Sequence, residues 1–158
     1  RINALLIEAI QKWNLKKIAD LLNEQTQMHG VVADLNHRLD FDETPLHMAV
    51  RSANIDSVQL LIKFFAEVNA QNSVGQTPLH FACQMGNLPI VKLLVKNFAQ
   101  VDQQDEEGNT CLHLACSGMY APVIVYLVEE ANANGQTPNF KNKTPYAQLM
   151  MKCELTGK

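Results

Sequence analysis

Two short segments of the chain carry the residue types of a metal site. Residues 80–83 (HFAC) and 113–116 (HLAC) each place a histidine three positions before a cysteine. On a helix this spacing puts both side chains on one face, where imidazole and thiolate could bind zinc. His47 stands in the same local sequence, but Val50 replaces the cysteine. Because so short a motif has low specificity, and because a repeat accounts for all three histidines, we expect no metal here.

The same histidines belong to a segment that recurs along the chain. Residues 44–47 and 77–80 read Thr-Pro-Leu-His, residues 110–113 read Thr-Cys-Leu-His, and residues 144–146 keep Thr-Pro before a tyrosine. Thr44, Thr77 and Thr110 are evenly spaced, and Thr144 follows one position later than that period requires. A tetrapeptide at so fixed a period is the signature of a repeat architecture. In both motif and period, the chain resembles the ankyrin-repeat proteins.

This resemblance implies an all-α fold, a solenoid of stacked helix-turn-helix units joined by β-turn finger loops. One array is expected to occupy residues 1–158. Its repeats are expected at about 3–38 (atypical, with an insertion), 39–71, 72–104, 105–138 and 139–158 (partial or capping). In the family, the histidine of the motif hydrogen-bonds to backbone between repeats, which gives His47, His80 and His113 a structural role.

The elements that position these residues can be predicted from the repeat itself. Each Thr-Pro pair marks a helix start, because threonine caps the free N–H groups and proline loses no hydrogen bond at the first helical position. Two sets of apolar residues take equivalent places: Leu6, Leu46, Leu79 and Leu112, and then Ala9, Ala49, Ala82 and Ala115. A single helix pair cannot bury its apolar face alone, so both sets should line a core shared by neighbouring repeats.

The chain departs from the family pattern at three places. Ala53 takes the turn position that Gly86 holds in the next repeat, where a left-handed backbone favours glycine, and we expect strain there. The family pattern also places a glycine near residue 65, but this chain has Phe65, and then Phe98 one repeat later. Alignment of the first two repeats indicates an insertion within residues 23–32, as a longer helix or a loop.

Composition limits the classes of function. The net charge of −3, without a long run of one sign, gives no reason to expect nucleic acid as a partner. No apolar run approaches the roughly 20 residues that span a bilayer, so we expect no direct membrane insertion. The first residues include neither an initiating methionine nor a signal-like apolar segment, and we expect the chain to be part of a longer protein.

The reactive side chains point to a binding protein rather than an enzyme. Two of the four cysteines occupy the same position of successive repeats, which suits buried thiols better than disulfides. We therefore expect a reducing compartment, cytoplasmic or nuclear. The sequence contains no nucleophile elbow, phosphate loop or paired-carboxylate signature, so we expect neither catalysis nor a cofactor.

A candidate binding surface follows from the resemblance. In the family, partner proteins usually lie across the finger tips and the exposed face of the first helices. The matching positions here include Asp40, Phe41, Glu43, Arg51, Val74, Gln76, Gln84, Met85, Glu106, Glu107 and Asn109. Apolar anchors with charged rims suit a protein partner. The alternative is that Phe41 and Val74 pack within their own fingers.

Two interpretations of function remain open. The first is a scaffold or adaptor that binds a partner protein through the finger tips and the concave inner-helix face. The second is a targeting or regulatory ankyrin domain of a larger enzyme or ion channel. In addition, residues Leu61, Glu67, Val68 and Asn69 resemble the pattern of the asparaginyl hydroxylase that modifies ankyrin fingers. That makes Asn69 a possible hydroxylation site, with an ordinary structural asparagine as the alternative.

Overall fold

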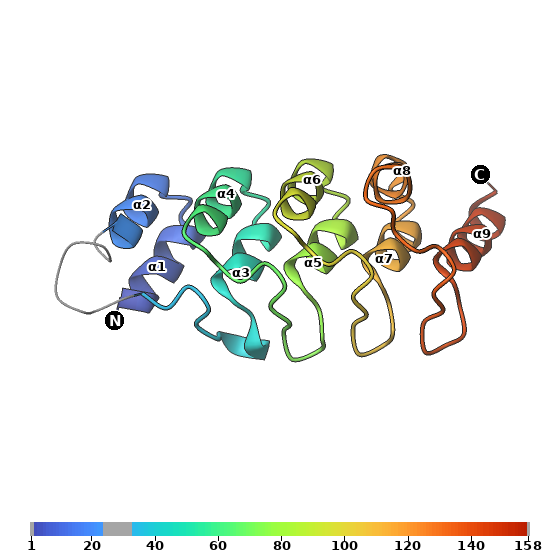
Figure 1. Cartoon of the computed structure of the whole chain (residues 1–158), viewed down its shortest axis with the longest axis horizontal. Helices are drawn as coiled ribbons and strands as arrows, with labels where there is room; N and C mark the ends of the chain where they lie inside the picture. The colour runs from blue at the N-terminus through green and yellow to red at the C-terminus, as the bar shows by residue number, and fades with distance from the viewer. Residues whose placement is uncertain (1, 24–32, 158) are drawn as a thin grey trace.

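Helices arranged in two parallel rows make up the protein (Figure 1). The computed structural model describes residues 2–23 and 33–157, and within them nine α-helices and no strands occur. The inner row contains α1 (Ile2–Gln11), α3 (Pro45–Arg51), α5 (Pro78–Gln84), α7 (Cys111–Ser117) and α9 (Pro145–Thr156). The outer row contains α2 (Leu15–Asn23), α4 (Ile55–Lys63), α6 (Leu88–Lys96) and α8 (Ala121–Glu129). A short 3-10 helix, η2 (Asp40–Asp42), lies in the first finger.

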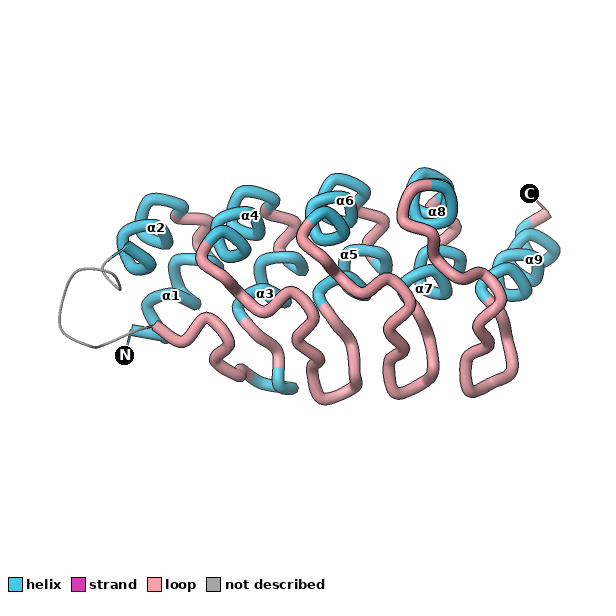
Figure 2. Tube along the Cα trace, viewed as in Figure 1, coloured by secondary structure: helices cyan, strands magenta, loops and turns pink. Residues whose placement is uncertain are grey.

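The helices pack as a stack of hairpins. Each inner helix contacts the outer helix that follows it, from α1 with α2 to α7 with α8. Each also contacts the next helix of its own row, along α1, α3, α5, α7 and α9 inside and along α2, α4, α6 and α8 outside. The loops between hairpins project to one side as fingers (Figure 2). The predicted all-α solenoid of stacked helix pairs is therefore confirmed, whereas the insertion expected at residues 23–32 falls almost entirely outside the described residues.

The core is continuous along the stack and contains the two predicted sets of residues. Leu6, Leu46, Leu79 and Leu112 are all buried, as are Ala9, Ala49, Ala82 and Ala115. All eight belong to one hydrophobic cluster. The small alanine side chains let neighbouring inner helices approach closely, and the leucines supply larger buried side chains to the same cluster. Because the two positions need side chains of different size, both alanine and leucine recur at the period of the repeat.

The threonine and histidine of the motif fix each inner helix to the next finger. The backbone N–H of Thr44 donates to Nδ1 of His47 at 3.1 Å, so Nδ1 is the acceptor and Nε2 carries the proton. That Nε2 donates to the carbonyl of Gln76 at 2.9 Å. His80 and His113 repeat the arrangement, donating to Asn109 and Lys143 at 3.1 and 2.9 Å. The inter-repeat role predicted for the three histidines is confirmed.

Several non-glycine residues adopt the left-handed backbone conformation. Ala53 has φ +56°, beside +66° for Gly86 at the equivalent turn, which confirms the expected strain. Phe65 and Phe98, where the family pattern has glycine, both have φ +67°. A left-handed conformation costs a residue with a Cβ atom roughly 1–2 kcal/mol. Each of these phenylalanines is therefore held in place against a local energetic preference.

The cysteines are free thiols, as predicted. Cys83, Cys111 and Cys116 are buried in the core, and Cys153 is half-buried in α9. Burial raises the pKa of the Cys116 thiol to about 11. Burial, together with the neighbouring Cys111, also raises the pKa of Cys83. The protonated thiols of Cys83 and Cys116 therefore pack as small apolar side chains and are poor nucleophiles.

Candidate functional site

The finger tips form a continuous edge because each tip is hydrogen-bonded to the next. The backbone N–H of Ser73 donates to the carbonyl of Phe41 at 2.8 Å, and that of Glu106 donates to the carbonyl of Val74 at 3.1 Å. The N–H of Phe140 donates to the carbonyl of Glu107 at 3.0 Å. These bonds hold the tips in register, so a partner would meet them as one surface.

One polar side chain organises each finger from within. The side-chain oxygen of Asn72 accepts from the N–H groups of residues 74 and 76, at 3.1 and 2.9 Å. Asp105 makes the equivalent bonds at 2.9 and 2.8 Å, and Asn139 makes two at 3.0 Å. Sequence reasoning missed these three residues. Their recurrence at the period of the motif threonines was the signal that could have revealed them.

A groove of about 620 Å³ lies between α1, the first finger and α3. It is lined by Ile7, Gln11, His37, Arg38, Leu39, Asp40, Phe41, Glu43, Met48 and Arg51. Four of the predicted binding residues thus meet in one place. The Phe41 ring is 77% exposed, and Val74 on the next finger is 47% exposed. Neither residue is packed away inside its own finger.

The charged wall of this groove is built around an ion pair. Nη1 of Arg51 lies 2.8 Å from Oε1 of Glu43, whose side chain is only 8% exposed. The expectation that Glu43 is part of the exposed binding strip is therefore wrong: its buried carboxylate lies beneath Arg51 and holds that guanidinium in position. Arg38 donates to the carbonyls of Asp42 and Gln71, at 3.1 and 2.9 Å, and so ties the first finger to the second.

A second, apolar groove of about 290 Å³ adjoins the first at Arg51. Its other walls are Phe81, Gln84 and Met85, the last two of which belong to the predicted strip. Phe81 was missed by sequence reasoning. Its ring packs edge-on against His47, with centroids 5.3 Å apart at 68°, so the core fixes the orientation of this groove wall. We call the two adjoining grooves together the binding groove.

The remaining predicted residues lie on the second and third fingers. Glu106 and Glu107 are exposed, and Glu107 pairs with Lys141 at 3.1 Å. Gln76 and Asn109 are half-buried, and their carbonyls already accept from the motif histidines. The structure therefore places Glu106 and Glu107 where a partner could reach them. It gives Gln76 and Asn109 mainly a role in holding the fingers.

The electrostatics of the motif histidines disfavour metal chemistry. Burial lowers the pKa of His47 to about 4, and burial also lowers the pKa values of His80 and His113. Both ring nitrogens of each histidine are occupied by hydrogen bonds. In residues 2–23 and 33–157, no three His, Cys, Asp or Glu side chains group closely enough to hold a metal ion. Over the same residues, no helix has the length and hydropathy of a membrane span.

Comparison with known families agrees with this geometry. A family model described as "Ankyrin repeats (3 copies)" matches residues 6–105, and one described as "Ankyrin repeats (many copies)" matches residues 85–128. No curated protein matches the chain. Ankyrin repeats are generally modules of protein–protein interaction. Since the first match alone covers more than half of the 158 residues, and since the helices stack as those repeats require, the chain belongs to the ankyrin-repeat family.

Proposed function

We propose that this chain is a non-catalytic scaffold or adaptor that binds a partner protein through the binding groove and the finger tips. The proposal rests above all on the meeting of the two grooves at Arg51. On one side of that residue the walls carry charges, and on the other they are apolar. An apolar centre beside a charged rim is the usual anatomy of a specific protein interface.

The partner is expected to insert an apolar side chain beside Phe81 and Met85. Met85 is 39% exposed, and its unbranched side chain can adapt to the shape of an anchor. Phe41 offers a second contact at the first finger tip. The charged wall carries Arg38 and Arg51 against Asp40 and Glu43, which leaves it close to neutral. The charged wall would therefore distinguish partners by the geometry of their hydrogen-bonding groups rather than by their net charge.

Paired substitutions test this proposal. A chain carrying Phe41→Ala and Met85→Ala should lose captured partners in a quantitative pull-down, because both anchors of the groove are removed. Leu155→Ala is the control, since Leu155 is an apolar residue on α9 that is 83% exposed, about as much as Phe41, and does not line the groove. If the double variant retained the same proteins as the control, the groove would not be the binding surface.

The same groove would serve the alternative role, a targeting or regulatory domain of a larger enzyme or ion channel. We infer the cytoplasm or nucleus as its location because all four cysteines are free. Trapping the thiols of protein from cells with an alkylating reagent tests that inference, and a disulfide in the native protein would contradict it.

Asn69 has a structural role that coexists with its proposed hydroxylation. Its Oδ1 accepts from the N–H of Gln100 at 2.8 Å, and its Nδ2 donates to the carbonyl of Phe98 at 3.0 Å. Mass spectrometry of protein from animal cells tests the modification. If Asn69 were always unmodified, only the structural role would remain.

A further inference from the structure

A third groove, of about 230 Å³, lies between α7 and α9. Its described walls are Ser117, Lys143, Gln148, Met151, Lys152 and Leu155, and we call it the α9 groove. Ser117, Gln148, Met151 and Lys152 take the repeat positions of Arg51, Phe81, Gln84 and Met85, which line the apolar part of the binding groove. The α9 groove is therefore the counterpart of that apolar part, two repeats further along the inner row.

The α9 groove differs from its counterpart in charge. Its described walls include Lys143 and Lys152 but no carboxylate. Lys143 takes the repeat position of Glu43, so the sign of the charge at this position is reversed between the second repeat and the last. Within residues 2–23 and 33–157 neither lysine forms an ion pair, whereas Arg51 in the binding groove is paired with Glu43. The α9 groove therefore carries two positive charges that no described carboxylate pairs with.

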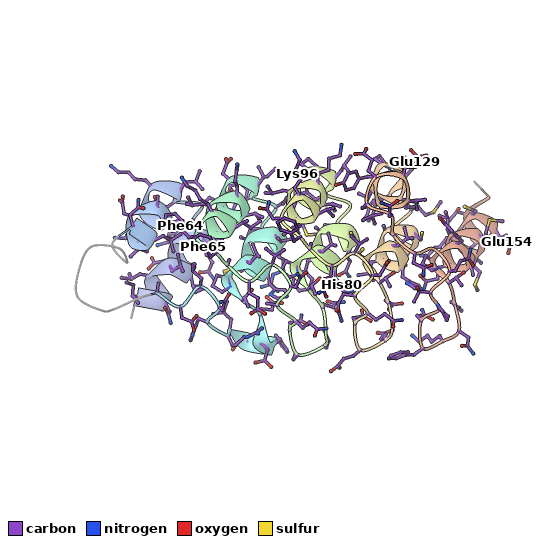
Figure 3. The ribbon with its side chains drawn as sticks, viewed as in Figure 1. Phe64, Phe65, His80, Lys96, Glu129 and Glu154 are labelled. Atoms are coloured by element: carbon purple, nitrogen blue, oxygen red, sulfur yellow. The ribbon has the colours of Figure 1, made fainter. Side chains whose placement is uncertain are left out.

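The acidic residues nearest in the sequence are directed or engaged elsewhere. Glu154, the one acidic residue of α9, follows the buried Pro145 by about two and a half helical turns, so the two lie on opposite sides of the helix. Figure 3 shows Glu154 at the end of the stack. Glu107, on the preceding finger, is paired with Lys141. Neither glutamate is part of the described wall of the α9 groove.

A polar side chain in this groove has no hydrogen-bond partner. Gln148 stands where α3, α5 and α7 have Met48, Phe81 and Leu114. Its Oε1 is buried, and among the described residues no group donates a hydrogen bond to it. Its Nε2 also donates to none of them. An apolar side chain would avoid the cost of a buried polar atom without a partner, so the glutamine indicates that this amide is used when the groove is occupied.

We propose that the α9 groove binds an acidic side chain of the partner protein, with the carboxylate between Lys143 and Lys152 and the adjoining chain against Met151. The inference rests on the proposed function, because the same segment of the partner would continue from the binding groove. A carboxylate can accept from both ammonium groups and from the Gln148 amide. Leu155 lies one turn beyond the level of the binding groove, so a segment that runs straight across the inner helices leaves it free.

The distance between the two grooves sets the spacing of the partner's residues. The grooves are two inner helices apart, and neighbouring helices pack at roughly 8–10 Å, which gives a separation of roughly 16–20 Å. An extended chain rises about 3.3 Å per residue, so the acidic residue should lie roughly five or six positions from the apolar anchor that fills the groove at Phe81 and Met85.

A nucleic acid or an anionic lipid surface fits the same groove less well. Either would bring many negative charges, and Glu106 and Glu107 are exposed on the preceding finger, where they would repel a polyanion. A peptide segment with one acidic side chain meets the two lysines without that penalty. The charges therefore favour an acidic peptide segment.

Selection of random peptides displayed on phage, with the whole chain as bait, tests the proposal. The wild-type chain should enrich peptides with an apolar residue and, roughly five or six positions away, Asp or Glu. The variant with Lys143→Glu and Lys152→Glu should enrich Lys or Arg there instead, because the charges of the groove are reversed. Lys63→Glu with Lys96→Glu is the matched control: it makes the same change of charge at two exposed lysines of the outer row, where Figure 3 shows Lys96, and should not alter the selected sequences.

An affinity measurement gives the size of the effect. A selected peptide in which the acidic residue is replaced by its amide should bind the wild-type chain roughly three- to tenfold more weakly, as expected for a partly exposed charge interaction. An equal affinity of the two peptides would overturn the inference. So would the same acidic preference in the wild-type and charge-reversed chains, or a change of preference in the outer-row control.

The same selection separates this inference from the proposed function. If the apolar residue were enriched without the acidic one, only the α9 groove would be excluded. If the chain with Phe41→Ala and Met85→Ala selected the same apolar residue, the proposed binding groove would be excluded instead, and a wild-type chain that selected no peptide would overturn both. Binding of an oligonucleotide or of phosphatidylserine vesicles that is lost in the charge-reversed chain would assign the α9 groove to a polyanion and overturn the inference.

Discussion

Acidification should destabilise the stack through its buried histidines, and His47 allows the effect to be calculated. In the folded chain its Nδ1 faces the N–H of Thr44, so a proton added there would meet a donor instead of an acceptor. Burial is the main cause that lowers its pKa from 6.5 to about 4. In the unfolded chain the imidazole is exposed and titrates near its ordinary value of about 6.5.

The sign of the effect follows from which state binds more protons. Between about pH 6.5 and pH 4 the unfolded chain is protonated at this residue and the folded chain is not, so the free energy of unfolding falls as pH falls. The contribution of His47 to stability is complete above the unfolded pKa and is lost by about pH 4. At roughly 1.4 kcal/mol per pKa unit, a shift from 6.5 to about 4 corresponds to about 3.5 kcal/mol. His80 and His113 shift in the same direction and should add to the loss.

Urea unfolding at a series of pH values between 7.5 and 4 measures this loss. His47→Gln is the informative variant, because its amide can still donate to the Gln76 carbonyl but cannot titrate. The variant should be less stable than wild type near pH 7, and its stability should fall less steeply with acid by about 1.4 kcal/mol per pH unit. If His47 titrated near pH 6.5 by NMR in the folded protein, or if the slopes of the two proteins were equal, the reasoning would be refuted.

Three further predictions concern stability and can be checked by thermal or urea unfolding. Ala82→Leu should cost about 1–3 kcal/mol by overpacking the inner row, while Ala147→Leu, at an exposed position of α9, should have little effect; equal melting temperatures would contradict the core assignment. Phe98→Gly should stabilise the monomer by about 1 kcal/mol, and a loss would show that the ring is packed in solution. Ser57→Ala should raise the free energy of unfolding by about 1 kcal/mol. The Ser57 hydroxyl is buried without a hydrogen-bond partner among the described residues, at a position where the next repeat has Ile90, and destabilisation would reveal a hidden partner.

The sequence predicted the features that every repeat must share. A core that continues from one hairpin to the next requires the same side chain at the same position, so Leu46 and Leu79 could be placed from their recurrence alone. Comparison of Ala53 with Gly86 at the equivalent turn likewise indicated a left-handed backbone at Ala53, whereas for Phe65 the sequence indicated only that a glycine was missing. His80 was placed correctly because the interaction that it makes is itself repeated.

The features that belong to one repeat only were harder to predict. Whether Glu43 lies on the surface or beneath Arg51 depends on how a single finger folds over a single helix, and a periodic pattern contains no such information. Phe81 illustrates the same limit. Its position is half-buried, and whether its ring lines a groove depends on the side chains of Arg51, Gln84 and Met85 around it, which do not recur from repeat to repeat.

The packing of each hairpin against only its neighbours has a mechanical consequence. A slight rotation at one interface displaces everything beyond it, and rotations at successive interfaces add along the chain. The curvature of the whole array is therefore its softest mode of deformation, while each hairpin stays rigid. If a partner contacted several fingers at once, the array could bend to fit it. The energy of that bending would be shared among all the hairpin interfaces between α1 and α9.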